Sequence, residues 1–163
     1  MNRELRPLRW TDIRTAYRLA CDPDERREAR DHSLPTFRGH LRWMWRWVGG
    51  GDYLAWVILD QGKPAGLVRA ESSFTTWRLW VVDADVPLRE QEMSIVLFPA
   101  FRGKRLASWA IREAAEKLDT RDGSITAYIR KGNRASMGAF RKAGFRFTGR
   151  VIEGLSQFVY GED

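Results

Sequence analysis

Hydrophobic and polar positions along the chain follow two periods, one of about two residues and one of about 3.6, which are typical of strands and helices respectively. Strands are expected at Leu5–Leu8, Tyr53–Leu59, Gly66–Ala70, Gln91–Phe98, Ser124–Ile129, Phe145–Ile152 and Gln157–Tyr160. Helices are expected from Thr11 or Asp12 to Ala20, from Pro35–Thr36 to the glycine break at residues 49–51, over Lys104–Leu118 and over Arg134–Lys142.

The order of these elements indicates the fold class. Two successive strand–helix units lie among hairpins, one of which turns at Asp60–Pro64. This order predicts an α/β (α+β) fold with a mixed sheet and helices packed on it. Asp22–Asp24 is expected to be a turn before a charged segment that is either helical or irregular up to Asp31. Phe74–Val82 is expected to be a further strand or an extended insertion.

The helix after Thr36 carries three stripes at about 100° per residue. The first is apolar and is expected to face the core: Leu41, Met44, Trp45 and Val48. The second contains His40, Trp43 and Trp47, and the third contains Arg42 and Arg46. The second stripe has two interpretations. It lines a pocket, or it packs on a neighbouring helix or a second copy of the chain.

Composition narrows the class of protein. At 163 residues, with 44% hydrophobic and 30% charged residues, the chain is expected to form one soluble domain over residues 1–163. No apolar run approaches the roughly 20 residues of a membrane span, and no hydrophobic signal segment opens the chain. Cys21 is the only cysteine and there are two histidines, so neither a disulfide framework nor a metal site is expected. These features favour a cytoplasmic protein without a membrane partner.

A basic turn follows the strand that ends before Pro99. Arg102, Lys104 and Arg105 crowd the expected start of a helix, where the helix dipole disfavours cations. No Ser, Thr, Asp or Asn stands just before Arg102 as a cap. A bound anion such as a phosphate would complete this site, whereas the alternative is a solvated basic turn. The chain has neither the dinucleotide-binding glycine pattern nor a P-loop.

Two segments carry a resemblance to a known family. Arg102–Ala107 resembles the phosphate-binding motif of the GNAT superfamily of N-acetyltransferases, in which Arg or Gln is followed three positions later by Gly and then by a terminal Gly or Ala. Arg105 replaces the central glycine of that motif. Asn133–Phe145 resembles the second family signature, in which an Asn-capped helix ends in Lys-x-Gly-Phe.

The resemblance implies a GNAT fold whose sheet is splayed at the cofactor strand, with acetyl-CoA as the cofactor. The matching positions implied to bind the cofactor are Val96, Leu97, Arg102, Gly103, Lys104, Arg105, Leu106, Ala107, Asn133 and Ser136. The implied reaction is direct transfer of an acetyl group from the thioester to an amine. Many members use a tyrosine of the second motif to protonate the thiolate, but this chain has Phe140 there, with Tyr128 and Tyr160 as weaker substitutes.

The chemistry also requires a base and a donor. An amine with a pKa near ~10 must lose a proton before it attacks. Glu92 is the candidate base because it begins the cofactor strand and shares one face with Ser94, and Glu71 is the second candidate. The alternative is that Glu92 is an ordinary exposed residue at a strand end. The backbone N–H of Leu97 is the expected donor to the thioester oxygen, since Pro99 ends the ladder nearby.

The acceptor is expected to be a small amine, above all an amino sugar. Arg18–Arg26, His40–Trp43 and Gly66–Arg69 resemble members that acetylate nucleotide-linked amino sugars. The expected substrate-binding residues are His40, Trp43, Trp47, Arg69 and Glu71. The net charge of +7 leaves two alternatives open: acetylation of a protein N-terminus or a nucleic-acid base, and a non-catalytic binding module. A monomer and a homodimer are both compatible with the sequence.

Overall fold

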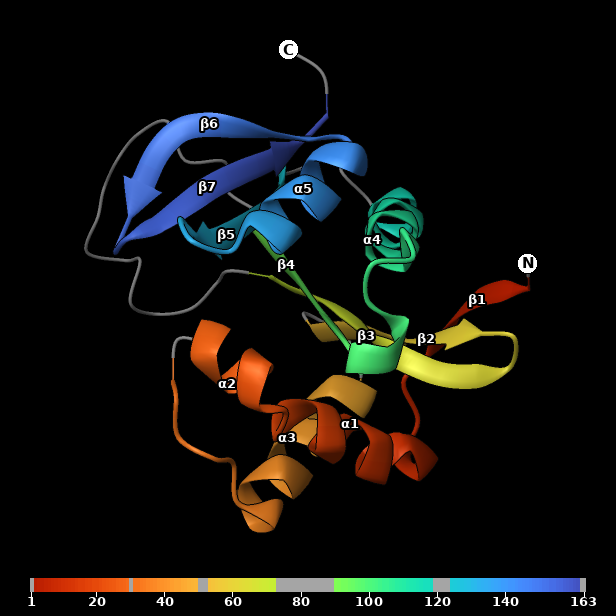
Figure 1. Ribbon diagram of the computed structural model, residues 1–163. Helices are drawn as coiled ribbons and strands as arrows, with labels where there is room; N and C mark the ends of the chain where they lie inside the picture. Colours follow the sequence, from red (N-terminus) through yellow and green to blue (C-terminus); the bar gives the residue numbers. More distant parts are fainter. Residues whose placement is uncertain (1, 30, 50–52, 73–89, 119–123, 162–163) are drawn as a thin grey trace.

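A mixed sheet runs through the centre of the molecule (Figure 1), in a computed structural model that describes residues 2–29, 31–49, 53–72, 90–118 and 124–161. Its strands are β1 (Arg3–Pro7), β2 (Tyr53–Asp60), β3 (Lys63–Ser72), β4 (Glu90–Leu97), β5 (Ser124–Arg130), β6 (Phe145–Ile152) and β7 (Leu155–Tyr160). The order across this 7-stranded sheet is β1-β2-β3-β4-β5-β7-β6. All neighbouring pairs are antiparallel except β4 and β5, which are parallel. The expected α/β fold with a mixed sheet is therefore confirmed.

The sheet opens between its two parallel strands. β4 and β5 pair only where residues 90–92 meet residues 124–126. Beyond that point β4 remains paired with β3 as far as Leu97, and β5 remains paired with β7 as far as Arg130. The C-terminal halves of β4 and β5 are therefore unpaired with each other, which confirms the expected splay at this strand.

Helices cover both faces of the sheet. They are α1 (Ile13–Ala20), α2 (Pro23–Glu28), α3 (Phe37–Val48), α4 (Leu106–Lys117) and α5 (Arg134–Lys142), with short 3₁₀ turns at Trp10–Asp12 and Pro99–Phe101. Figure 1 shows α1, α2 and α3 together on one side of the sheet, and α4 on the other. No helix within the described ranges is both long and apolar enough to span a membrane.

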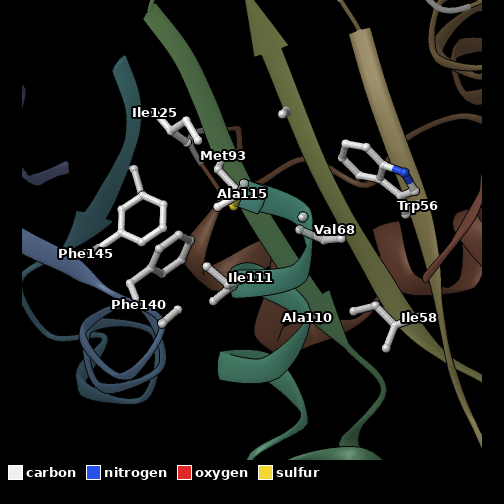
Figure 2. Close-up of a cluster of buried hydrophobic side chains, with 14 of the residues drawn as sticks. Trp56, Ile58, Val68, Met93, Ala110, Ile111, Ala115, Ile125, Phe140 and Phe145 are labelled. Carbon is white, nitrogen blue, oxygen red and sulfur yellow. The ribbon is translucent and has the colours of Figure 1, made fainter. Parts of the chain in front are cut away.

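The face under α4 and α5 is sealed by apolar side chains. Ile111 of α4 and Phe158 of β7 are fully buried there, with Met93 of β4 and Phe140 of α5 among their neighbours. Figure 2 shows how the side chains of α4 and α5 meet those of the strands beneath them. Burial of each large apolar side chain favours folding by roughly 1.5–3 kcal/mol, so this cluster holds the two strand–helix units together.

The expected core face of α3 is wrong in part. Met44 is buried, but Leu41 is 40% exposed and Trp45 is 76% exposed, whereas His40 and Trp47 are 4% and 6% exposed. The reason lies in the contacts of α3 with other elements. The inner face meets aromatic rings of other elements, so that His40 packs on Tyr17 of α1 and Trp47 packs on Tyr53 of β2.

Two other expectations change at element ends, and a third is not tested. Asp12 does not cap α1, because its carboxylate instead accepts hydrogen bonds from the Arg9 N–H and the Arg6 guanidinium. Asp22 accepts hydrogen bonds from the N–H groups of Asp24 and Glu25, so the expected turn is the start of α2. The expected strand over residues 74–82 lies outside the described residues.

Candidate functional site

The turn between β4 and α4 has the backbone of an anion site. Gly103 and Arg105 both have left-handed conformations, with φ of 76° and 57°. Arg105 is the N-cap of α4, and no side chain caps that helix. Successive N–H groups in such a turn, followed by the open N-terminus of a helix, form a concavity that favours phosphate oxygens. The turn fits the pyrophosphate of the expected cofactor, and α4 begins at Leu106 rather than at the expected Lys104.

The left-handed conformation of residue 105 accounts for the glycine that the motif has at this position. An L-residue in the left-handed region costs roughly 1–2 kcal/mol, whereas glycine adopts it at little cost. Arg105 nonetheless has φ 57° and ψ 17°. Arg105 therefore adopts a conformation that a glycine at this position would adopt at little cost. Its exposed side chain adds a positive charge beside that of Lys104.

The Arg102 side chain is engaged within the protein. Its Nε donates to the carbonyl oxygen of Leu97 at 3.1 Å, and its two terminal nitrogens form ion pairs with Asp22 and Asp24. Burial acts to raise the pKa of Asp22, but Arg102 and backbone N–H groups of α2 outweigh it and lower that pKa. Arg102 is the first residue of the turn motif, and its guanidinium is therefore directed toward α2.

The N–H of Leu97 lies on the open side of β4. Phe98, the next residue, donates its N–H to Ala65 of β3 at 2.9 Å. Because N–H groups alternate in direction along an antiparallel strand, the Leu97 N–H points away from β3 and toward the gap. Gly66 keeps β3 close at this point, since a Cβ there would lie 2.3 Å from the Val96 carbonyl oxygen. The geometry is that expected of a donor at the splay, and the catalytic role of Leu97 stays a prediction.

The second motif forms the start and end of α5. The side-chain oxygen of Asn133 accepts a hydrogen bond from the Ser136 N–H at 3.0 Å, so Asn133 is the N-cap. Gly144 ends the helix region with φ 103°, and a Cβ there would lie 3.1 Å from the Tyr160 ring. Because β4 and β5 are parallel, the helices that follow them both begin at the splayed edge of the sheet. Asn133, Ser136 and the basic turn are therefore placed at the same edge.

The opposite side of the sheet has a polar centre. Glu71 and Glu92 are register partners on β3 and β4, as are Arg69 and Ser94, and alternation places all four on the face covered by α1 and α3. Arg69 Nε donates to Ser94 Oγ at 3.1 Å. The expected common face of Glu92 and Ser94 is confirmed.

The aromatic stripe of α3 reaches this polar centre. The guanidinium carbon of Arg69 lies 5.7 Å from the Trp43 ring centroid and 5.6 Å from that of Trp47. His40 stacks on Trp43 with a centroid distance of 5.2 Å, but it also contacts Tyr17 and is buried. Burial lowers the pKa of His40, which favours a neutral imidazole. The structure brings Trp43, Trp47 and Arg69 together, while His40 lies in the core behind them.

Comparisons with known proteins agree with this geometry. The family model described as "Acetyltransferase (GNAT) domain" matches residues 3–146. The chain belongs to the GNAT acetyltransferase family. No curated protein matches this GNAT chain significantly in sequence.

Solved structures share the GNAT fold at low sequence identity. An aminoglycoside acetyltransferase, AAC(6')-Ib, solved with ribostamycin and coenzyme A, superposes with a TM-score of 0.78 at 15% identity, covering 98% of this chain and 93% of that chain. A spermidine N-acetyltransferase from Vibrio cholerae, solved with CoA and spermine, gives 0.76 at 16% identity, with 96% and 94% coverage. A putative phosphinothricin N-acetyltransferase gives 0.73 at 21% identity, with 98% of each chain covered.

The GNAT structure places the two candidate tyrosines, Tyr128 and Tyr160, on different sides of the sheet, with Phe140 on the side of Tyr160. Phe140 is buried and meets Phe145 edge to face at 4.9 Å, so it is a core residue. Tyr160 packs on the same apolar side, against Phe145. Tyr128 lies on the polar side, where its hydroxyl donates to Glu90 Oε1 at 2.6 Å.

Sequence reasoning missed the polar cluster at the base of the splay. Glu90 is 5% exposed and accepts hydrogen bonds from the Thr126 and Tyr128 hydroxyl groups. Gln157 Nε2 in turn donates to the Tyr128 oxygen at 3.0 Å. The signal was available, because Glu90 lies two residues before Glu92 and the period of two places both on one face.

Proposed function

We propose that this GNAT acetyltransferase transfers the acetyl group of acetyl-CoA to the primary amine of a small molecule, with an amino sugar as the acceptor class. The observation that carries the proposal is the gap between β4 and β5, which has a phosphate-binding turn at its edge and a carboxylate-bearing face beside it. Solved structures with this fold contain CoA or acetyl-CoA together with aminoglycosides or spermine. A cytoplasmic location fits this activity and the single cysteine of the chain.

Backbone groups of the turn would hold the cofactor. The N–H groups from Gly103 to Ala107 suit the pyrophosphate, and the positive charges of Lys104 and Arg105 add attraction for phosphate. Val96 and Leu97 line the open edge of β4, while Asn133 and Ser136 lie at the start of α5. When bound, acetyl-CoA supplies an activated acetyl thioester.

Residues of the polar face would prepare the acceptor. Glu92 is proposed to remove the proton from the acceptor ammonium, because its carboxyl lies on the strand that also presents the Leu97 N–H. That N–H is proposed to donate a hydrogen bond to the oxygen that gains negative charge. Both groups are fixed by β3, so their separation is set by the sheet rather than by a loop.

The acceptor pocket is proposed to lie between α3 and the sheet. Trp43 and Trp47 supply aromatic surface beside Arg69, and Glu71 lies one strand away from Glu92. Aromatic faces pack well on sugar rings, and carboxylates attract the ammonium groups that an amino sugar carries. These features support a small cationic acceptor.

The test is a thiol-release assay with acetyl-CoA and a panel of acceptors. The panel contains nucleotide-linked amino sugars, aminoglycosides, polyamines, peptides and tRNA. Turnover with an amino sugar well above background, lost in Glu92→Gln, is the expected result. Turnover confined to peptides or tRNA would replace the acceptor class, whereas acetyl-CoA binding without turnover of any acceptor would indicate a binding module. Failure to bind acetyl-CoA in calorimetry would overturn the proposal altogether.

A further inference from the structure

The guanidinium of Arg102 joins two parts of the molecule that lie 80 residues apart in sequence. Its Nε donates to the Leu97 carbonyl oxygen at the end of β4. One terminal nitrogen binds Asp22 at 2.9 Å, and the other binds Asp24. Asp22 is the N-cap of α2, so its carboxylate serves the helix and Arg102 together. All three nitrogens of this side chain therefore have partners within the protein.

A second arginine holds the other end of the same helix. Arg130 is the last residue of β5, and it donates from Nε to the Glu28 carbonyl at 3.1 Å and from a terminal nitrogen to the Ala29 carbonyl at 2.9 Å. Carbonyls at the end of a helix lack intrahelical donors and carry partial negative charge, which a cation stabilises. Arg130 thus fixes the C-terminal end of α2 to β5.

The two anchors come from the two strands that separate. Arg102 follows the end of β4, and Arg130 ends β5, which are the sides of the gap. We propose that Arg102 is a positioning residue that, with Arg130, holds α2 across the gap as a wall of the acceptor site, and that its side chain is not a phosphate ligand. This inference rests on the proposed function for the identity of the acceptor site.

Glu25 of α2 is half-buried, and the charge of Arg69 on the polar face acts on its carboxyl. Burial raises the pKa of the Glu25 carboxyl, and the charges of Arg69 and Arg26 act in the opposite direction. Arg69 is the residue that contacts Trp43, Trp47 and Ser94. Release of α2 would therefore disturb the acceptor side of the gap and leave the backbone of the cofactor turn in place.

Hydrogen exchange on the ligand-free protein tests the anchor directly. In Arg102→Met we expect the amides of residues 24–29 to exchange about tenfold faster, as for the loss of hydrogen bonds between charged groups. The amides of α4 should remain unchanged. Lys104→Met is the matched control, because Lys104 lies two residues away in the turn and has an exposed side chain. It should leave the exchange of α2 unchanged.

Calorimetry with acetyl-CoA separates the two roles. Arg102→Met should change the Kd by less than about threefold, whereas Lys104→Met should raise it by roughly fivefold through the loss of one charge near phosphate. Arg102→Met should also raise the acceptor KM about tenfold, with partial recovery in Arg102→Lys.

Three results would overturn the inference. They are unchanged exchange of α2 in Arg102→Met, a rise in Kd for acetyl-CoA larger than that of Lys104→Met, and full activity with α2 released. Absence of turnover in the wild type would instead contradict the proposed function, and the exchange and calorimetric results would still decide the role of Arg102.

Discussion

The two faces of the sheet are built from the same strands and differ in what they bury. Under α4 and α5, Ile111 and Phe158 are completely enclosed by apolar neighbours. Under α1 and α3 a second apolar cluster is buried, which includes Leu19 and Met44, and beside it the sheet presents Arg69, Glu71 and Glu92. Alternation along each strand supplies both faces at once. Both faces therefore contribute buried apolar side chains to stability, and the face under α1 and α3 also carries the polar groups that are proposed for chemistry.

Removal of a large side chain from the apolar face should have the largest effect. Phe158→Ala is expected to lower the free energy of unfolding by about 3–5 kcal/mol, because Phe158 is 0% exposed and leaves a cavity. Urea denaturation followed by circular dichroism measures the change. A loss below about 1 kcal/mol would contradict a major contribution of the cluster around Phe158 to stability.

Neutralising the candidate base should affect turnover more than stability, the reverse of what is expected for Phe158→Ala. Glu92→Gln is expected to lower turnover about a hundredfold, the usual contribution of a positioned general base, and to lower the free energy of unfolding much less than Phe158→Ala does. Acetyl-CoA affinity should stay the same. Glu71→Gln, on the register partner of Glu92, is the comparison variant, because Glu71 is placed in the proposed acceptor pocket but is not the proposed base. Equal loss of turnover in both variants would shift the role from one residue to the pair.

The buried histidine under the polar face should make stability depend on pH. Because burial lowers the pKa of His40 in the folded state, the unfolded chain binds a proton first as the pH falls. The stability that His40 contributes is present above the ordinary imidazole pKa of 6.5 and is lost as the pH falls from there through the folded pKa. His40→Phe should flatten this range, and His32→Gln should not. A profile unchanged by His40→Phe would contradict the assignment.

Asp12 and Asp22 act in a separate and more acidic range. The pKa of each is lowered in the folded state, since ion pairs and backbone N–H groups outweigh the effect of burial. Their stabilisation is present above the ordinary carboxyl pKa of 3.8 and is lost as the pH falls from there through the folded pKa of each. The two ranges can therefore be separated in one titration.

The smallest expected effect comes from the turn. Arg105→Gly should raise the free energy of unfolding by up to about 1 kcal/mol, because glycine relieves the left-handed conformation at some cost in chain entropy. Arg105→Ala removes the charge and keeps the strain, so it should not be stabilising. Thermal denaturation compares the two variants. Equal stability of both would show that the strain at this position is negligible.

Local signals predicted much of the fold and the turn. The period of two located β4 and the common face of Glu92 and Ser94, and Pro99 indicated where the pairing of β4 with β3 ends, although β4 and β5 already separate after Glu92. Asn133 was predicted as the cap of α5, and its side chain bonds the Ser136 N–H. Each of these features depends on residues close in sequence, which is why the sequence was sufficient.

Contacts between distant segments could not be predicted in this way. The buried face of α3 was wrong at Leu41 and Trp45, because the rings of Tyr17 and Tyr53 determine which side of the helix is enclosed. The partners of Arg102 lie on α2, and neither helix propensity nor charge pattern relates the two segments. The sequence indicated which side chains are charged but not which of them meet.

The left-handed arginine in the turn has a consequence for how such motifs are described. A pattern written in residue letters demands glycine at that position and would reject this chain there, although Arg105 adopts a left-handed conformation that glycine adopts readily. A pattern written in φ and ψ would accept it, and it would also accept asparagine and aspartate, which tolerate this conformation better than most residues. Families defined by phosphate-binding turns are therefore broader in sequence than their consensus letters indicate.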